Sequence, residues 1–429
     1  MKQTAKSVGL DRTELIPFNE ITQRLLRGEI IVVPECLQRI GYFEEIKEAS
    51  LAGIRQATND EKAAQVRRKG LEEIHTVIDV DDITSVSDQT YKTIRPLASK
   101  LAKALVREIF QEKTHYYFEE SPNVRFHIPY DLTLSRRKEL NQFKYNGKIT
   151  PHGPHHDSWY QCPTNCVNVW IAIGPVKVGN GLNIYPTIYG KKLPCTQEGK
   201  IVPGQSFGPV LSFNLQPGDA LIFHGEHLHS SELNSTDFTR FVISMRMVIG
   251  TPHFLEDSPY KDNYIFGDTR KGIGARFSEI AANLGRNLRK KLNRGERSYI
   301  LSNLKSVAFN DNSDSFPTNI PVESIKIPSE NKTKTIFDSK ELPVGSIRPI
   351  SNKMCVARLP DQRVIAFSRY CSHEGADLAS GYLRDGCVVC PWHSLPFNLK
   401  GGASPCQSLA SLEATECVEN EGKVEVTHN

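Results

Sequence analysis

Two short cysteine–histidine pairs near the C-terminus constrain the fold of this chain more than any other feature. Cys371 and His373 are one residue apart, sixteen residues follow His373, and Cys390 and His393 then stand two residues apart. Each pair predicts a loop that presents one thiolate and one imidazole, and Pro391 suits a tight second loop. Six of the ten cysteines lie in the last 75 residues. We therefore expect a compact C-terminal unit that holds the two loops face to face.

The donor set of these loops identifies the kind of site. Two thiolates and two neutral imidazoles hold a Rieske [2Fe–2S] cluster, in which the cysteines bind one iron and the histidines bind the other. A tetrahedral zinc site with the same ligands is the alternative. Zinc motifs usually supply a cysteine pair and a separate histidine pair, whereas here each loop supplies one residue of each type. The pattern favours the cluster, with Cys371, His373, Cys390 and His393 as its ligands.

Residues 336–427 resemble the Rieske ferredoxin family. The resemblance rests on the CPWH loop, on the phenylalanine and the Gly-Gly turn that follow it, and on the closing strands VEN-EG-KVEV. High-potential members of the family join their two cluster loops by a disulfide. Ala376 and Trp392 occupy those positions here, which excludes that bridge. The resemblance implies a small all-β domain of the lower-potential branch, which donates electrons to an oxygenase.

A second group of candidate ligands lies far upstream. The window PHGPHHDSWY contains His155 and Asp157, and His229 lies in the later segment GDALIFHGEHLHSSEL. Both side chains of a His-x-Asp pair on one strand point to the same face, because side chains alternate along a strand. A histidine from an adjacent strand would complete the 2-His-1-carboxylate face that holds ferrous iron in oxygenases and leaves coordination positions open.

The later segment resembles the phytanoyl-CoA dioxygenase-like family of iron(II)/2-oxoglutarate oxygenases, whose fold is a double-stranded β-helix. Arg240 lies eleven residues after His229. In the family, the arginine at this spacing grips the distal carboxylate of 2-oxoglutarate, which a bidentate guanidinium suits. His227 is an alternative iron ligand, but only His229 keeps the family spacing. The candidate 2-oxoglutarate contacts are Arg240, Ser231, Trp170 and Asn168. We expect the last three to pack against the site or to orient its groups rather than to take part in catalysis.

The pattern of apolar runs predicts the fold class. Runs such as VNVWIAI, LNIYPTI, VLSFNL, DALIFH and RFVISMRMV, separated by glycine, proline and asparagine, are typical of a sandwich or jelly roll. Helical patterns occupy residues 19–27 and 62–118, and a short strand is expected at 30–33. We expect a mainly β protein with flanking helices: an oxygenase domain over 1–304 with its jelly-roll core at about 150–250, a linker over 305–335, and the Rieske domain over 336–429.

A final helix of the oxygenase domain is marked by Ile280, Leu284, Leu288 and Leu292. Its other face is basic and carries Arg286, Arg289, Lys290, Lys291, Arg294 and Arg297. Such a face could bind an acidic partner, but a run of charges on a helix is more often solvated, which we expect here.

Composition excludes several classes of protein. With 53 basic and 49 acidic residues the net charge is only +4, too even for a protein that mainly neutralises phosphates or anionic lipid. The longest apolar runs are far shorter than the ~18 residues of a bilayer span, and the N-terminal sequence has no apolar core of a signal peptide. We expect a soluble, cytoplasmic protein without nucleic-acid or membrane partners. A homo-oligomer stays open.

Together the two sites predict a non-haem iron oxygenase that hydroxylates or desaturates a small organic substrate with O2 and 2-oxoglutarate and releases succinate and CO2. Its cofactors would be Fe(II), 2-oxoglutarate and the [2Fe–2S] cluster. Asp157 stands where related halogenases have a small residue, which disfavours halogenation. Substrate and cosubstrate supply all the electrons of this reaction. The cluster would therefore rescue oxidised iron, or bring in an electron from a ferredoxin reductase or another donor.

Three other interpretations stay open at this point. A Rieske-type oxygenase fed by a reductase would use no 2-oxoglutarate, but such enzymes place the Rieske domain first, and the role of Arg240 would be unexplained. A redox-sensing module without enzyme activity would consume no oxygen. Zinc in both sites is the third interpretation.

Overall fold

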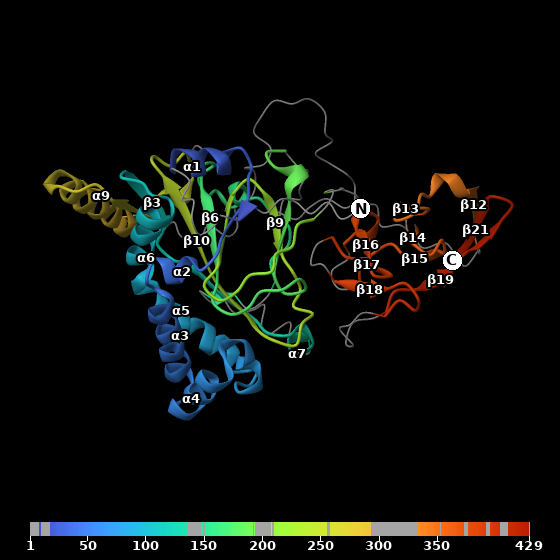
Figure 1. Ribbon diagram of the computed structural model, residues 1–429, viewed down its shortest axis with the longest axis horizontal. Helices are drawn as coiled ribbons and strands as arrows, with labels where there is room; N and C mark the ends of the chain where they lie inside the picture. The colour runs from blue at the N-terminus through green and yellow to red at the C-terminus, as the bar shows by residue number, and fades with distance from the viewer. Residues whose placement is uncertain are drawn as a thin grey trace. The chain divides into compact units, whose positions relative to one another are not determined.

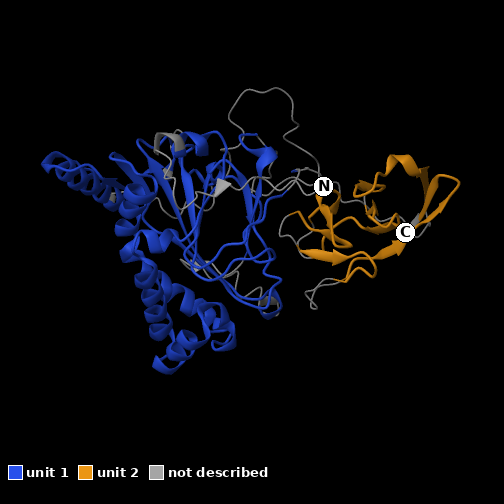
Figure 2. Ribbon diagram, in the orientation of Figure 1, with its two compact units in different colours: residues 1–201, 207–305, 392–394 blue, residues 202–206, 306–391, 395–429 orange. Residues whose placement is uncertain are grey.

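The computed structural model describes residues 8–9, 18–134, 147–148, 151–191, 193, 207, 210–254, 258–292, 333–351, 353–372, 376–391, 395–403 and 411–428. The chain forms two compact units, a larger one over residues 1–201 and 207–305 and a smaller one over 306–391 and 395–429 (Figure 2). Most of the expected linker lies outside the described residues, and its bounds stay a prediction. Strand β12 (Thr333–Asp338) begins three residues before the expected start of the Rieske domain.

Two sheets form the centre of the larger unit. In the first, the main path of hydrogen-bonded strands is β1-β2-β8-β6-β10-β3-β11, and β4 pairs with β10 and β5. Its strands are β1 (Val8–Gly9), β2 (Ile31–Val33), β3 (His115–Glu119), β4 (Asn123–His127), β5 (Gly147–Lys148), β6 (Val167–Ala172), β8 (Ala220–His224), β10 (Arg240–Ile249) and β11 (Tyr264–Asp268). The second sheet pairs β7 (Leu182–Tyr185) with β9 (Leu228–Ser231).

Strand β10 illustrates why the two faces of the first sheet differ. Its outer residues belong to the apolar core beneath the helices, and its inner residues face the second sheet; these are Phe241, Ile243, Met245 and Met247 outside and Arg240, Val242, Ser244 and Arg246 inside. Side chains alternate along a strand, so this sequence places two arginines in the interior. Between the sheets, Trp170, Ile184 and Phe223 pack together. The predicted double-stranded β-helix is confirmed.

Helices cover the outer face of the first sheet. They are α1 (Phe18–Leu26), α2 (Cys36–Arg39), α3 (Phe43–Ala57), α4 (Asp60–Lys69), α5 (Ile83–Ile94) and α6 (Ala98–Ala104), and a short α7 (Tyr130–Leu134) follows β4. Figure 1 shows α3, α5 and α6 on the opposite side of this sheet from β9. Ile46, Val86 and Leu101 join the apolar core with Val169 and Ile243.

Three predictions about elements need correction. The region predicted as helical over 62–118 ends in β3, because His115–Glu119 pairs with β10 and β11. Helix α3 was not predicted. The run VLSFNL forms no strand; Leu211 and Leu215 make only isolated bridges to Ile184 and Val176. The predicted helix at 19–27 and the strand at 30–33 are confirmed as α1 and β2.

The predicted final helix is α9 (Ile273–Leu292). The expectation that its basic face is solvated is wrong for two of its members. Arg286 is 7% exposed and the Lys290 side chain is 19% exposed, whereas Leu284 and Leu288 of the apolar face are more than half exposed. The described helices include none with the length and apolarity that a bilayer span requires.

The smaller unit is all-β in its described part, as predicted. Its three sheets have the orders β12-β21-β20, β13-β14-β15-β19 and β16-β17-β18. Their strands after β12 are β13 (Ile347–Pro349), β14 (Met354–Arg358), β15 (Val364–Ser368), β16 (Tyr382–Arg384), β17 (Cys387–Val389), β18 (Pro396–Asn398), β19 (Ala414–Glu416), β20 (Val418–Asn420) and β21 (Lys423–His428). Phe337, Val356 and Val424 pack in its core. The closing strands VEN and KVEV form the hairpin β20–β21.

Candidate active site

His155, Asp157 and His229 lie together in the interior of the larger unit. Their ligand atoms all lie within 4.8 Å of one another, and all three residues are buried. His229 belongs to β9, and His155 pairs with it through two backbone hydrogen bonds of 3.0 and 3.1 Å. The Asp157 amide donates to the Gly225 carbonyl at 3.0 Å. The residues that the sequence predicted as iron ligands are thus brought together.

The local backbone differs from the predicted strand. His155 forms only an isolated bridge, His156 is extended, and Asp157 begins the 3-10 helix η4 (Asp157–Tyr160). The segment bonds to β9 at His155 and at His152, whose carbonyl accepts from the Ser231 amide at 2.9 Å, but the Asp157 amide bonds to Gly225 in the turn before β9. Strand alternation therefore does not explain how the two side chains converge.

Both imidazoles are held in the form that binds a metal. His155 Nδ1 donates to the Gly153 carbonyl at 2.8 Å, and His229 Nδ1 donates to the His227 carbonyl at 2.8 Å. A carbonyl only accepts, so the proton of each neutral ring is on Nδ1 and the lone pair is on Nε2. Burial lowers the pKa of His155 well below its usual value, helped by His152 and His229, and burial lowers the pKa of His229.

The Asp157 carboxylate is fixed on both oxygens. Oδ1 accepts from Arg246 Nε at 2.8 Å and lies 2.6 Å from Nη2, and Oδ2 accepts from Asn168 Nδ2 at 2.5 Å. Arg246 Nη1 also donates to Glu119 at 3.1 Å. Burial raises the pKa of Asp157, but Arg246 outweighs it and the pKa falls to about 2. Asp157 is therefore ionised at neutral pH, and two neutral imidazoles beside one carboxylate fit a divalent iron.

Of the four other histidines in the two windows, His152 packs against His155 with ring centroids 4.1 Å apart, and the other three make contacts elsewhere. His227 Nε2 donates to the Gly28 carbonyl at 3.0 Å, and His156 Nδ1 donates to the Glu226 carbonyl at 3.0 Å. Tyr189 contacts His224 Nδ1 at 3.2 Å. Burial lowers the pKa of His227 to about 3. These contacts favour a structural role for all three, and His229 over His227 as the ligand.

Arg240 is completely buried at the start of β10. Nη1 donates to the carbonyls of Asn180 and Gly181 at 2.9 and 2.5 Å, Nη2 lies 2.6 Å from His127 Nδ1, and Trp170 stacks at 5.5 Å from Cζ. Within the described residues, Nε has no hydrogen-bond partner and the guanidinium has no ion pair with a carboxylate. Burial, then Arg125, lowers its pKa to about 9. A buried cation with an unused donor fits a carboxylate-bearing cosubstrate.

The cluster loops of the smaller unit are described in part. Cys371 and Cys390 are 3% and 1% exposed. The Cys371 amide donates to the Ala376 carbonyl, and the Cys390 amide donates to the Leu395 carbonyl, each at 2.9 Å. The two bonds fold each loop back on itself just after its cysteine. His373 and His393, like Trp392, lie outside the described residues, and their assignment as ligands stays a prediction.

Comparison with known families agrees with both sites. The family model for phytanoyl-CoA dioxygenase (PhyH) matches residues 43–242, and the model for the Rieske [2Fe-2S] domain matches residues 332–416. The chain therefore carries a phytanoyl-CoA dioxygenase-type region followed by a C-terminal Rieske domain. The two families imply Fe(II), 2-oxoglutarate and a [2Fe–2S] cluster as its cofactors.

Curated relatives of this PhyH–Rieske chain match it over short stretches. Cholesterol 7-desaturase nvd of Bombyx mori is 30% identical over 112 residues, which cover 24% of this chain and 25% of the desaturase. The ferredoxin subunit of anthranilate 1,2-dioxygenase from Burkholderia cepacia is 35% identical over 77 residues, 16% of this chain and 71% of the subunit. The solved structure of EctD from S. alaskensis with 2-oxoglutarate and 5-hydroxyectoine is 14% identical, with 58% of this chain and 84% of EctD covered and a TM-score of 0.34.

Several buried residues of the PhyH domain were not predicted. Arg125 and His127 lie inside on β4, and Glu119 and Arg246 complete the charged interior. Burial lowers the pKa of Arg125 to about 10. The signal was present in the sequence NVRFHI, because alternation places its arginine and histidine opposite its apolar residues. Asn168 contacts Asp157, and Trp170 stacks on Arg240; the 2-oxoglutarate contacts of Ser231, Trp170 and Asn168 stay predictions.

Proposed function

We propose that the larger unit is an Fe(II)/2-oxoglutarate-dependent oxygenase that hydroxylates or desaturates a small organic substrate. The observation that carries the proposal is the buried group of His155, Asp157 and His229, which shares the interior between the two sheets with a buried arginine that lacks a carboxylate partner among the described residues. In hydroxylation, O2, 2-oxoglutarate and the substrate C–H bond would give succinate, CO2 and the alcohol. Iron with bound 2-oxoglutarate would supply the oxygen activation for this step.

The residues of the chain would bind and orient the reactants. Arg240 would bind the distal carboxylate of 2-oxoglutarate with Nε, which has no partner in the described part of the chain, and with Nη1 or Nη2. The bound carboxylate would replace some of the present contacts of these two nitrogens with carbonyls and with His127. A guanidinium buried among carbonyls and an aromatic ring gains most from such a partner, because water cannot compensate its charge there. Asn168 and Arg246 would keep Asp157 ionised and oriented.

The Rieske domain would supply electrons to the iron of the larger unit or restore that iron after an unproductive oxidation. The four donors at 371, 373, 390 and 393 support a cluster, and the Rieske match supports an electron-transfer role. Its own electrons would come from a ferredoxin reductase or another small donor. The substrate oxidation needs no external electron, so a rescue role predicts that activity begins without a donor and declines with turnover.

Spectroscopy and product analysis test the proposal. The protein is loaded with Fe(II) without oxygen, 2-oxoglutarate is titrated in, and the visible charge-transfer band is recorded. We expect a band that is lost in Asp157→Ala and that needs much more 2-oxoglutarate in Arg240→Gln. Arg67→Gln is the matched control, because Arg67 is half exposed and pairs with the half-exposed Glu48.

Oxygen consumption separates the proposal from its rivals. With a substrate and 2-oxoglutarate present but no reductase or NADH, the amount of succinate formed should equal the amount of O2 consumed. Consumption that requires a reductase and NADH but no 2-oxoglutarate would support a Rieske-type oxygenase. Absence of both the band and oxygen consumption in iron-loaded protein would overturn the proposal.

A further inference from the structure

Helix α9 presents a continuous apolar stripe to solvent. Its exposed residues follow one another at intervals of four, three, four and four positions, which places them on one side of an α-helix. They are Ile273 (75% exposed), Phe277 (69%), Ile280 (66%), Leu284 (59%) and Leu288 (53%). Apolar side chains of this size rarely line up exposed on a helix without a function. The helix runs along the sheet edge near β3 and extends beyond it (Figure 1).

The helix is attached to the larger unit through its polar face. Asn283 accepts from the Phe266 amide at 3.1 Å and donates to the Phe266 carbonyl at 2.9 Å, which satisfies the edge of β11. Arg286 donates to Glu120 at 3.1 Å, and Lys290 pairs with the same carboxylate. An ordinary amphipathic helix buries its apolar side, whereas α9 packs against the larger unit through its polar side. The apolar stripe therefore faces solvent.

The helix carries more cations than carboxylates, and three of the cations, Arg286, Arg289 and Lys290, are ion-paired with Glu120 or Asp262 of the larger unit. Residues 273–292 contain five cations, Arg276, Arg286, Arg289, Lys290 and Lys291, and one carboxylate, Glu279. Arg276 and Lys291 are exposed, and Lys271 just before the helix is exposed as well. Exposed cations beside an apolar stripe are typical of helices that lie in the interface of an anionic membrane.

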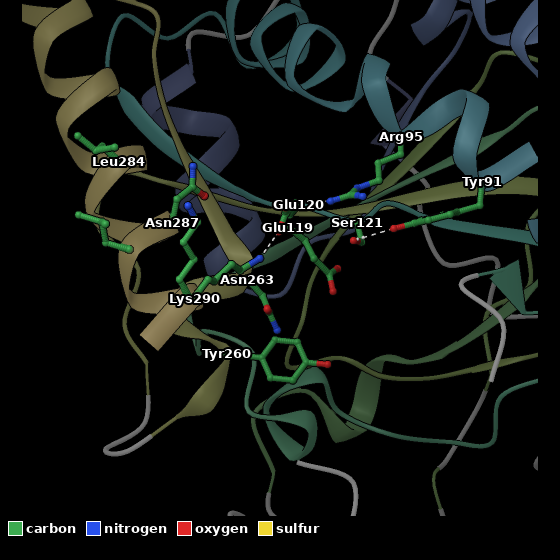
Figure 3. A pocket seen from close by; sticks show the side chains of 12 residues that line it. Tyr91, Arg95, Glu119, Glu120, Ser121, Tyr260, Asn263, Leu284, Asn287 and Lys290 are labelled. Atoms are coloured by element: carbon green, nitrogen blue, oxygen red, sulfur yellow. Dashed lines mark hydrogen bonds and ion pairs between the residues drawn. The ribbon is translucent and has the colours of Figure 1, made fainter. Parts of the chain in front are cut away.

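A pocket of about 790 Å³ adjoins the C-terminal end of the stripe. Leu284, Leu288, Lys290 and Lys291 of α9 line one side of it, and Arg95 lies across from them (Figure 3). The carboxylates Glu119 and Glu120 also line it, and Glu120 pairs with Arg95 and Lys290. The pocket contains none of the candidate iron ligands, although Glu119, which bonds Arg246, lines it.

We propose that α9 is an interfacial helix that docks the protein on anionic lipid bilayers. A second copy of the chain is a less suitable occupant for two reasons. Antiparallel pairing would bring the cations near Arg276 against those near Lys291, and five large side chains are far fewer than the ~20–30 residues that each partner contributes to a standard interface. A bilayer accepts any length of stripe and attracts the exposed cations Lys271, Arg276 and Lys291.

The docking proposal departs from the expectation of no membrane partner. That expectation rested on the absence of a long apolar run and on the even net charge of the whole chain. Neither observation reports on a single helix, and the outward direction of the stripe depends on contacts of Asn283, Arg286 and Lys290 that lie outside any local sequence pattern.

Cosedimentation of the full chain with lipid vesicles tests the proposal. The vesicles are either pure phosphatidylcholine or phosphatidylcholine with about one third phosphatidylserine, at low and at physiological salt. We expect binding to the anionic vesicles that is at least tenfold tighter than to the neutral ones and weaker at higher salt. Phe277→Ser and Ile280→Ser together should abolish most of it, because both side chains lie in the stripe. Val344→Ser with Val418→Ser is the matched control, since both valines are at least half exposed in the smaller unit.

Sedimentation velocity completes the experiment. A wild-type monomer that binds anionic vesicles, and variants that keep the wild-type circular dichroism but lose binding, would support the proposal. Equal binding to both vesicle types, or binding that the stripe variants retain, would overturn it. A stable dimer that the same variants dissociate, without vesicle binding, would overturn it in favour of a second copy.

Discussion

At the scale of single residues, Gly225 is packed against the candidate iron site. A Cβ at this position would lie 2.7 Å from Cys166 Sγ and 3.1 Å from Asp157 Oδ2. Both neighbours are buried and cannot move away freely. We expect Gly225→Ala to lower the free energy of unfolding of the larger unit by about 1–3 kcal/mol, as overpacking does, and to weaken iron binding.

Urea unfolding of the iron-free protein and anaerobic iron titration would measure the two effects. Gly153→Ala is the control, because a Cβ at Gly153 meets no atom within 4 Å and the residue lies in the same loop as His155. Equal stability of the two variants would contradict the packing reason.

Arg246 is the residue on which the geometry of Asp157 most depends. Its guanidinium bonds Asp157 through two nitrogens and Glu119 through the third. Lysine keeps the charge but has one nitrogen, so Arg246→Lys cannot hold both carboxylates in this arrangement. We expect iron affinity to fall by about 10–100-fold, measured by anaerobic competition with a chromogenic chelator.

The control for this change is Arg67→Lys, which alters a bidentate pair with Glu48 in which both side chains are half exposed. Unchanged iron affinity in Arg246→Lys, with intact circular dichroism, would show that Asn168 and the backbone suffice to orient Asp157.

The sequence predicted the candidate ligands of iron and cosubstrate better than the residues that support them. His155, Asp157 and His229 could be found because the donor types and the spacing to Arg240 are local properties. Arg246 and Glu119 meet Asp157 only after β3, β6 and β10 are paired, and nothing in the sequence around any of them specifies that meeting. Strand alternation predicts only that the side chains of Arg246 and Glu119 point inward.

At the scale of elements, the attachment of α9 should depend on pH through Glu120. Burial raises the pKa of this carboxyl, but Lys290 and Arg286 outweigh it and hold the pKa at about 2 in the folded protein, below its ordinary value of 4.5. A depressed folded pKa stabilises the folded state above the unfolded pKa, and the contribution is lost as pH falls. We expect the attachment to be strongest above about pH 5 and to weaken progressively toward pH 2.

Hydrogen exchange of the α9 amides, corrected for intrinsic rates, would follow this change. Glu120→Gln should exchange several-fold faster than wild type at pH 7 and show little further change at pH 3. Glu48→Gln is the control, because Glu48 pairs with Arg67 on the surface of the helices and should leave α9 protection unaltered. A wild-type protein whose α9 protection is constant from pH 7 to pH 3 would contradict the assigned role of Glu120.

Elements with a clear periodic pattern of apolar residues were predicted well. A short strand, and a helix that is attached through its polar face, were predicted less well. Strands β6, β8 and β10 follow the apolar runs because both of their faces are buried, one under helices and one between the sheets. Strand β3 is only five residues long and follows directly on helical sequence. The helical spacing of the apolar residues in α9 was predicted correctly. Such spacing separates an apolar face from a polar one, but it does not show which face packs against the rest of the protein.

At the scale of the whole molecule, the chain carries two redox sites of different kinds. Cys371 and Cys390 lie in one compact unit, and the candidate iron ligands lie in the other. The proposed oxygenase reaction balances its electrons without the cluster. The Rieske domain should therefore affect activity over many turnovers, or when an external electron donor is present, rather than in the first turnover.

Removing a predicted cluster ligand tests this role. In His373→Ala, assayed without ascorbate, we expect the initial rate of succinate formation to match wild type and the number of turnovers before inactivation to fall several-fold, because oxidised iron would no longer be reduced. Added ascorbate should restore the turnover number, since it replaces the missing electron source. His253→Ala is the control, because this histidine is exposed in the larger unit. If His373→Ala loses the EPR signal of the reduced cluster yet completes as many turnovers as wild type, the cluster does not rescue the iron. If the initial rate itself collapses, the cluster takes part in every turnover and the reaction needs an external electron.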